Sequence, residues 1–337
     1  MVSKDNKHGT VRLHSYDNET NLFVELHTFS KKTNFGENSD WSSSVVYNNG
    51  IVYMVSADKE NTLLFYNAMT GVSGEIPVTG IPDNMKLAES YNDYVHEQTL
   101  HIPRLTISAN GQKLFTTLFD PEDASVSDAL IDLDTGKCTV LESLGQESIR
   151  SRSAAFSEDG SKLACSSDYS ILIYKNNYAE HSKISTRGLN VRSMVWFKDD
   201  LWVEYTSDMV ERFSADGELI SQIELDYRSS NAFDPIPKWT TVPISDNKEG
   251  LMLTDGGNMN LLSEDYAATT PVLYVPNFTG WDNDSDTFLV LSSEISAVNE
   301  ESGLPYLYFY TYPRYSKDDL IRSGTQQREA MQEEDEE

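Results

Sequence analysis

Basic side chains recur just before the first apolar segment of successive units of the sequence. Arg and Lys bind carboxylates and phosphates through charge-assisted hydrogen bonds. A cluster of them would form a docking site for an acidic peptide, a phosphate group or an acidic loop of a partner. The alternative is local pairing with neighbouring acids such as Glu147 or Asp199, since surface ion pairs are weak and need no ligand. The candidate partner-binding residues are Arg104, Arg150, Arg152, Arg187, Arg192 and Lys238.

Two segments resemble metal sites but lack the spacing that a metal requires. His96 and His101 are five positions apart, so on a helix they would not share the face that the HExxH zinc motif uses. Residues 282–286 begin like a calcium loop, but Thr287 and Ser293 stand where such a loop needs Gly and Glu. An acidic turn between two strands is the better interpretation. The sequence therefore predicts neither a metal site nor a cofactor.

Known catalytic motifs are missing from the sequence as well. It contains no Gly-x-Ser-x-Gly elbow, no P-loop and no Gly-x-Gly-x-x-Gly motif, and its 6 histidines are scattered. Residues far apart in a sequence can still converge into a catalytic triad. Catalysis is therefore disfavoured, and we expect the chain not to be an enzyme.

The charge of the chain constrains its partners. There are 54 acidic and 26 basic residues, which give a formal net charge of −28. Such a surface repels the phosphates of nucleic acids and anionic lipids but attracts a basic protein. The charge could equally serve solubility alone. No apolar run approaches the length of a membrane span.

Cysteine usage and the N-terminal segment indicate a reducing compartment. Cys138 and Cys165 are too few for a disulfide framework and too far apart for a zinc site, so both are expected to be reduced packing residues. The first ten residues are polar and show no apolar signal-peptide region. We expect a cytoplasmic protein, with the nucleus as the alternative.

The elements that must position the basic residues are short strands. Residues 9–29 alternate apolar and polar side chains on both sides of a turn, with the period of a β-strand. Residues 44–55 contain two strands joined at Asn48-Asn49-Gly50, a strong hairpin signal. Residues 154–175 contain two short strands, a turn that ends at Gly160, and a third strand. This pattern predicts an all-β fold.

The strand pattern repeats along the chain. Turn-leading residues recur at intervals of roughly 40–50 residues with four strands in each interval, which is typical of propeller blades. Residues 81–102 interrupt the repeat as an insertion. The turn-leading residues are Ser108, Ser157, Lys198, Ser245 and Asp282.

Three stretches carry a family resemblance: GTVRLHSYDNET, FSEDGSKLACSSDYSILIYK and LIDLDTGKC. They resemble WD40-type repeats, in which a strand ending in Phe-Ser is followed by an Asp-Gly turn, a strand of small residues, Ser-x-Asp and an alternating strand. The repeats are divergent, since no Gly-His pair opens them. The resemblance implies a toroid that presents loop faces to partners, usually without enzymatic activity. The matching positions are Ser157, Asp159, Gly160, Leu163, Ala164, Ser167, Asp168, Ile171 and Ile173.

The predicted fold is an all-β, WD40-like β-propeller of about seven four-stranded blades, with six blades as the alternative. A single propeller domain is expected over residues 1–324, with the insertion at 81–102. Residues 325–337 are expected to form an acidic disordered tail, because their composition cannot bury a core. The sequence leaves open how the N-terminal pair of strands is closed.

A propeller would place the loops that lead into its inner strands on one face, near the central channel, and would gather the six basic residues into an arc. The expected function is a non-catalytic protein–protein interaction scaffold, in its specific form an assembly factor or chaperone for a basic client. The partner would be a protein with a basic surface, or an acidic or phosphorylated peptide bound on the arc. The alternative is a propeller-fold enzyme, a hydrolase or lyase with its site at the channel mouth.

Overall fold

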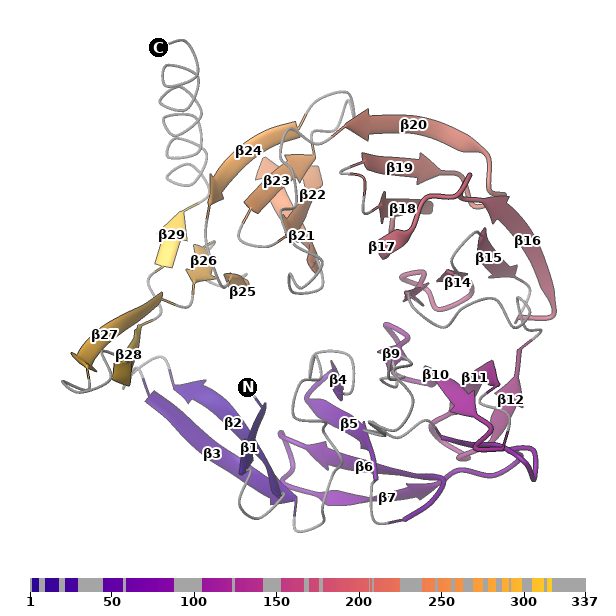
Figure 1. Cartoon of the computed structure of the whole chain (residues 1–337), viewed down its shortest axis with the longest axis horizontal. Coiled ribbons are helices and arrows are strands. Elements are labelled where there is room, and N and C mark those ends of the chain that lie inside the picture. The colour runs from indigo at the N-terminus through magenta and orange to yellow at the C-terminus, as the bar shows by residue number, and fades with distance from the viewer. Residues whose placement is uncertain are drawn as a thin grey trace. The chain divides into compact units, whose positions relative to one another are not determined.

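The computed structural model consists of antiparallel sheets built mostly from consecutive strands (Figure 1). Its described residues contain no helix, and so none that could cross a membrane. The chain divides into two compact units, Met1–Ser207 with Glu211–Ile220, and Asp208–Val210 with Ser221–Glu337. The residues that the structure describes are 2–5, 10–17, 22–29, 45–56, 59–87, 105–122, 125–141, 153–166, 170–175, 178–205, 207, 209–224, 238–245, 248–255, 258–262, 269–274, 278–282, 287–290, 292–298, 305–311 and 314–316.

The N-terminal sheet of the first unit has three strands in the order β1-β2-β3. The hairpin predicted within residues 9–29 is confirmed by the antiparallel pairing of β2 (Thr10–Asp17) with β3 (Leu22–Phe29). A third strand, β1 (Val2–Asp5), pairs with the other side of β2 and was not predicted. Its four residues, VSKD, are too short and too polar to stand out as a strand in the sequence.

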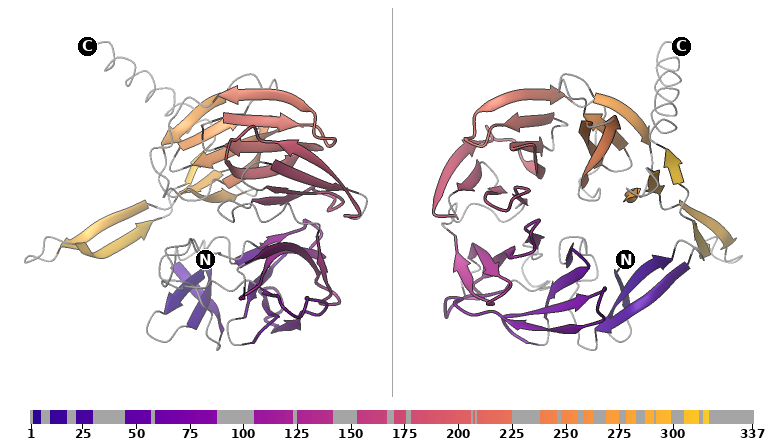
Figure 2. Two further views of the ribbon diagram at one scale, coloured as in Figure 1. Left: turned by 45° about the vertical axis from the view of Figure 1, so that its right-hand side comes forward. Right: turned by 180° about the vertical axis from the view of Figure 1, so that it is seen from behind.

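The next sheet, β4-β5-β6-β7, confirms the hairpin signal at Asn49-Gly50. Asn49 and Gly50 both have positive φ, 47° and 80°, which is the geometry of a type I′ turn. This turn matches the twist of the strands that it joins, and such twist is visible in the views of Figure 2. The strands are β4 (Val45–Asn48), β5 (Ile51–Val55), β6 (Thr62–Asn67) and β7 (Ser73–Pro77).

The third sheet includes part of the predicted insertion at 81–102. Lys86–Leu87 forms the short strand β8 and pairs with Leu118 and Phe119 of β10. The insertion therefore adds a strand to this sheet before the described residues break off at Leu87. Burial of an apolar side chain explains why β8 pairs with β10, because Leu87 lies in the hydrophobic core. The other strands are β9 (Thr106–Ile107), β10 (Lys113–Phe119), β11 (Val126–Asp132) and β12 (Cys138–Val140).

Two more four-stranded sheets follow, and the three strands predicted within residues 154–175 are confirmed in the first of them. The second sheet contains residues of both units. The two sheets are linked by a buried hydrogen bond of 3.0 Å from Trp196 Nε1 to the carbonyl oxygen of Ala155. Their strands are β13 (Ala154–Phe156), β14 (Leu163–Ser166), β15 (Ser170–Lys175) and β16 (Glu180–Ser185), then β17 (Val191–Phe197), β18 (Asp200–Tyr205), β19 (Met209–Phe213) and β20 (Leu219–Glu224).

The turn from β13 to β14 is built from its own side chains. The Ser157 hydroxyl donates to Asp159 Oδ1 at 2.7 Å, and the Ser161 backbone N–H donates to the same oxygen at 3.0 Å. These hydrogen bonds lower the pKa of Asp159 to about 2. Gly160 closes the turn with a φ of 70°, a conformation that favours glycine.

The second unit departs from the predicted count of four strands per segment in its last part. The described residues between Phe278 and Ser316 form a three-stranded sheet, β25-β26-β29, and a separate two-stranded sheet, β27-β28. A long hairpin thus replaces one strand, because β27 and β28 pair with each other instead of extending the sheet. The strands of this unit are β21 (Lys238–Ser245), β22 (Lys248–Asp255), β23 (Asn258–Leu262), β24 (Thr269–Tyr274), β25 (Phe278–Asp282), β26 (Thr287–Val290), β27 (Ser292–Val298), β28 (Pro305–Thr311) and β29 (Arg314–Ser316).

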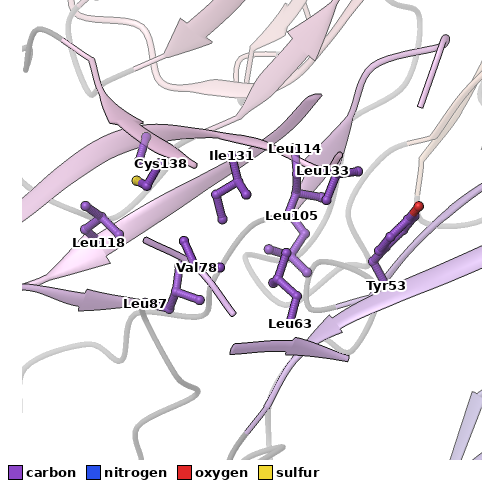
Figure 3. Close-up of a cluster of buried hydrophobic side chains, with 11 residues drawn as sticks. Tyr53, Leu63, Val78, Leu87, Leu105, Leu114, Leu118, Ile131, Leu133 and Cys138 are labelled. Carbon is purple, nitrogen blue, oxygen red and sulfur yellow. The ribbon is translucent and has the colours of Figure 1, made fainter. Parts of the chain in front are cut away.

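Aliphatic side chains from neighbouring sheets form the core of the first unit. In one cluster, Leu63 of the β4–β7 sheet packs with Leu114 and Ile131 of the next sheet, and all three are fully buried (Figure 3). Cys138 lies in this cluster and Cys165 lies in another. Both cysteine side chains are buried, as predicted, and neither forms a disulfide bond. Burial raises the pKa of Cys138 to about 11.

Candidate interaction surface

The loop that leads into β17 presents Arg187 in a defined conformation. The Leu189 backbone N–H donates to the Thr186 carbonyl oxygen at 3.0 Å and closes a tight turn. Both central residues have positive φ, 57° at Arg187 and 84° at Gly188. Such a conformation costs a non-glycine residue about 1–3 kcal/mol, so surrounding contacts must hold Arg187 in place.

A buried carboxylate supplies that contact. The Arg187 guanidinium forms an ion pair with Glu211 Oε1, although the Arg187 side chain is 55% exposed and that of Glu211 only 1%. The Tyr205 hydroxyl donates to Glu211 Oε2 at 2.8 Å from inside the sheet. Burial, together with this hydrogen bond, raises the pKa of Tyr205. Glu211 thus links a core tyrosine to an arginine at the surface.

A second buried acid lies in the same sheet. Glu204 accepts a hydrogen bond of 2.7 Å from the Ser193 hydroxyl, directly across the β17–β18 pair. Arg192 occupies the bulge between Val191 and Ser193, where the register of β17 shifts. Since both Ser193 and Glu204 are buried, their hydrogen bond holds two strands together inside the sheet.

Two of the six predicted basic residues lie at the start of β17. Arg187 lies in the turn before β17, and Arg192 lies within that strand. Lys238 begins β21 in the other unit, and its side chain is not among the described ones. Arg104, Arg150 and Arg152 lie outside the described residues, so the arc stays a prediction.

For Arg187, the structure supplies the local ion pair that was the alternative to docking. The acid is Glu211, which is 24 positions away and was not predicted as a partner. Glu204 and Tyr205 were missed as well. One signal was available, because Glu204 interrupts the apolar run Leu201–Tyr205 and must have a partner if that run is a buried strand.

Metal-binding potential can be judged for the part of the chain that the structure describes. In that part, no three His, Cys, Asp or Glu side chains come together in a group that could hold a metal ion. The residues from His96 to His101, and most of the acidic turn at 282–286, lie outside it.

Comparisons with known proteins show the fold. No family model matches the sequence, and no curated protein matches it. Among solved structures, the chain is similar to the complex of KlAtg21 with the coiled coil of AgAtg16, at 14% identity, with 80% of each chain covered and a TM-score of 0.52. The Dos1 propeller is similar at 9% identity and a TM-score of 0.52, with 84% of this chain and 70% of that chain covered.

The chain has a WD40-like β-propeller fold. This confirms the predicted all-β propeller class, and the number of blades stays a prediction. At such low identity the similarity describes the arrangement of the backbone and transfers no residue role.

Proposed function

We propose that this propeller is a non-catalytic scaffold that binds a basic protein partner in the cytoplasm, as an assembly factor or chaperone for a basic client would. The observation that carries the proposal is the excess of acidic over basic residues, 54 against 26, in a chain with a β-propeller fold. Propellers use the loops at the ends of their sheets as recognition surfaces. One structural neighbour is a complex with a coiled coil, and a protein partner for this chain is in keeping with it.

Ion pairs within the molecule occupy several basic side chains and leave acidic residues in excess. The described basic side chains include several that already have acidic partners within the first unit, namely Lys113 with Asp132, Lys162 with Asp199, Lys175 with Asp216 and Arg212 with Asp200. Even if all 26 basic residues were paired in this way, 54 − 26 = 28 acidic residues would remain. The field around the chain therefore favours a partner rich in Lys and Arg.

An acidic or phosphorylated peptide on the basic arc is the less supported form of the proposal. Arg187 would have to release or share its bond to Glu211, and a buried carboxylate that loses its counter-ion is costly. The basic-client form requires no such rearrangement.

Capture by the immobilised full chain, at low and at raised salt, tests the proposal. We expect partners with basic surfaces that are released as salt rises, because screening weakens exposed charge pairs. Charge reversal of Arg152 and Arg192 to Glu is the matched variant, and Arg187 is left in place because it neutralises the buried Glu211. Basic partners should bind this variant at least as well as the wild type, whereas an acidic peptide on the arc would be lost. Acidic partners, capture that ignores salt, or turnover of a substrate by the purified chain would overturn the proposal.

A further inference from the structure

Three large apolar side chains are exposed at one end of the β4–β7 sheet. Tyr47, Met69 and Val72 are 67%, 75% and 54% exposed. Tyr47 precedes the β4–β5 turn, and the other two lie in the β6–β7 turn. The Ala68 backbone N–H donates to the Gly50 carbonyl oxygen at 2.7 Å, so the two turns form one surface. Met69 also lies so close to Gly50 that a Cβ there would meet its Cγ at 2.8 Å.

The neighbouring sheet contains the same turn with charged residues at the positions of Met69 and Val72. The turn at 67–72 reads NAMTGV and the β11–β12 turn at 132–137 reads DLDTGK. The Gly71 N–H donates to the Asn67 carbonyl at 2.8 Å, and the Gly136 N–H donates to the Asp132 carbonyl at the same distance.

The remaining backbone contacts of the two turns correspond as well. The Asn67 backbone N–H donates to the Val72 carbonyl oxygen at 2.8 Å. In the other turn, the Asp132 backbone N–H donates to the Lys137 carbonyl oxygen at 2.9 Å. Asp134 and Lys137 stand where the first turn has Met69 and Val72. The turn therefore folds without apolar residues at these positions, and folding does not explain their presence.

The two turns themselves contain no charged residue. Residues 47–51 and 67–74 contain no Asp, Glu, Lys or Arg, although 24% of the chain is charged. Exposed apolar groups gathered on one surface mark interaction sites in soluble proteins, and a central apolar contact usually carries most of the binding energy.

We propose that Tyr47, Met69 and Val72 form an anchor site for a protein segment whose apolar side chains are flanked by Lys or Arg. The proposal rests on the proposed function and names the surface on which the basic partner docks. The apolar part of the segment matches the uncharged turns, and the basic flanks match the net charge of −28 of the chain. An exposed tyrosine ring also attracts Arg or Lys through its face. A second copy of this chain is a poor occupant, because two molecules of charge −28 repel each other.

The decisive variant places two residues of the β11–β12 turn at the corresponding positions of the β6–β7 turn. The double substitution M69D/V72K installs the residues of the β11–β12 turn and leaves the net charge unchanged. The matched control is L219D/I220K, which removes two exposed apolar side chains from β20 with the same charge balance. Both variants should keep the wild-type circular dichroism spectrum and thermal midpoint within a few degrees.

A photo-crosslinking residue at position 69, with one at position 220 as control, identifies the bound segment in the full chain during salt-dependent capture. We expect position 69 to crosslink a segment with apolar residues between Lys or Arg. A synthetic peptide of that segment should bind M69D/V72K at least about tenfold more weakly than wild type, and L219D/I220K equally well.

Several results would overturn the anchor site. One is a crosslink from position 69 to a second copy of this chain, or to an acidic or wholly polar segment. Another is equal binding of the peptide to M69D/V72K and L219D/I220K. The last is no crosslink from position 69 while salt-sensitive capture persists. In the last case the proposed function stands and only the surface is wrong. Absence of any salt-sensitive partner for the wild type would overturn the function and the anchor site together.

Discussion

The sheets β13–β16 and β17–β20 have the same four-stranded topology but different polar interiors. In the first, β14 ends in Ser166, whose hydroxyl accepts a bond of 2.8 Å from the Ser153 backbone N–H. In the second, Glu204 of β18 occupies the corresponding position and accepts a bond from the Ser193 hydroxyl. Glu211, one strand further on, adds a second buried acid.

The aliphatic frame of the two sheets is shared. Leu163 and Leu201 are both fully buried, opposite Phe156 and Trp196 in their respective strand pairs. The comparison teaches that strand pattern and aliphatic positions are enough to specify a blade. Buried acids are then tolerated only where the fold brings a donor to each of them.

Truncation of the shared aliphatic position should have the largest effect. We expect L163A and L201A each to lower the free energy of unfolding by about 2–5 kcal/mol, because each leaves a cavity in a fully buried site. Urea titration followed by tryptophan fluorescence measures this. Unequal losses beyond the error of the titration would break the claim that the two sheets share one frame.

Removal of Glu211 should have the next largest effect and has no counterpart in β13–β16. E211A leaves the Tyr205 hydroxyl buried without its acceptor, at a cost of about 2–3 kcal/mol. E211Q should lose less, because its amide oxygen can still accept that bond. An alanine variant as stable as the wild type would show that the buried acid does not stabilise the sheet.

The contact between the two sheets can be weakened by W196F. This variant keeps a smaller aromatic side chain but removes the donor to the Ala155 carbonyl, and we expect a loss of about 1–2 kcal/mol. W239F, at a partly exposed tryptophan of the second unit, is the control for the change in fluorescence. Equal stability of W196F and wild type would mean that apolar packing alone joins the sheets.

The smallest effect is expected at Asp159, and it depends on pH. The pKa of Asp159 is lowered from 3.8 to about 2, so its stabilising contribution is complete above pH 4 and is lost as the pH falls through this interval. The contribution should be under about 1 kcal/mol, because the side chain is exposed and solvent screens it.

The corresponding turn between β9 and β10 provides the control for this prediction. Asn110 accepts the equivalent bond of 2.7 Å from the Ser108 hydroxyl. D159N should therefore keep the turn while flattening the acid dependence of the urea midpoint. An unchanged pH profile in D159N would assign the acid sensitivity to other carboxylates.

Much of the fold could be predicted because its signals are local. The two-residue turn at Asn49-Gly50 and the turn that ends at Gly160 each fix a hairpin register within a few residues. Strands that depend on a distant partner were missed or miscounted. β8 forms because Leu87 is buried in the core and pairs with Leu118 of β10. β27 and β28 pair with each other instead of completing a four-stranded sheet.

The candidate site was less accessible to prediction than the fold. Arg187 was identified from its position before a strand, but its partner Glu211 was not, because the two are 24 residues apart. The apolar residues Tyr47 and Met69 carry no sequence signal of exposure, since identical side chains fill the core elsewhere. Only the placement of both turns at one sheet end shows that they form a surface.

The sequence by itself determined the strand period, the glycine and asparagine turns and the acid excess, because each depends on residues that are adjacent or simply summed. The tertiary structure decided which acids are buried, which arginine is already paired and which apolar side chains are left outside. These outcomes depend on contacts between distant residues, and the free energy of burying a charge or exposing a methionine is set by those contacts alone.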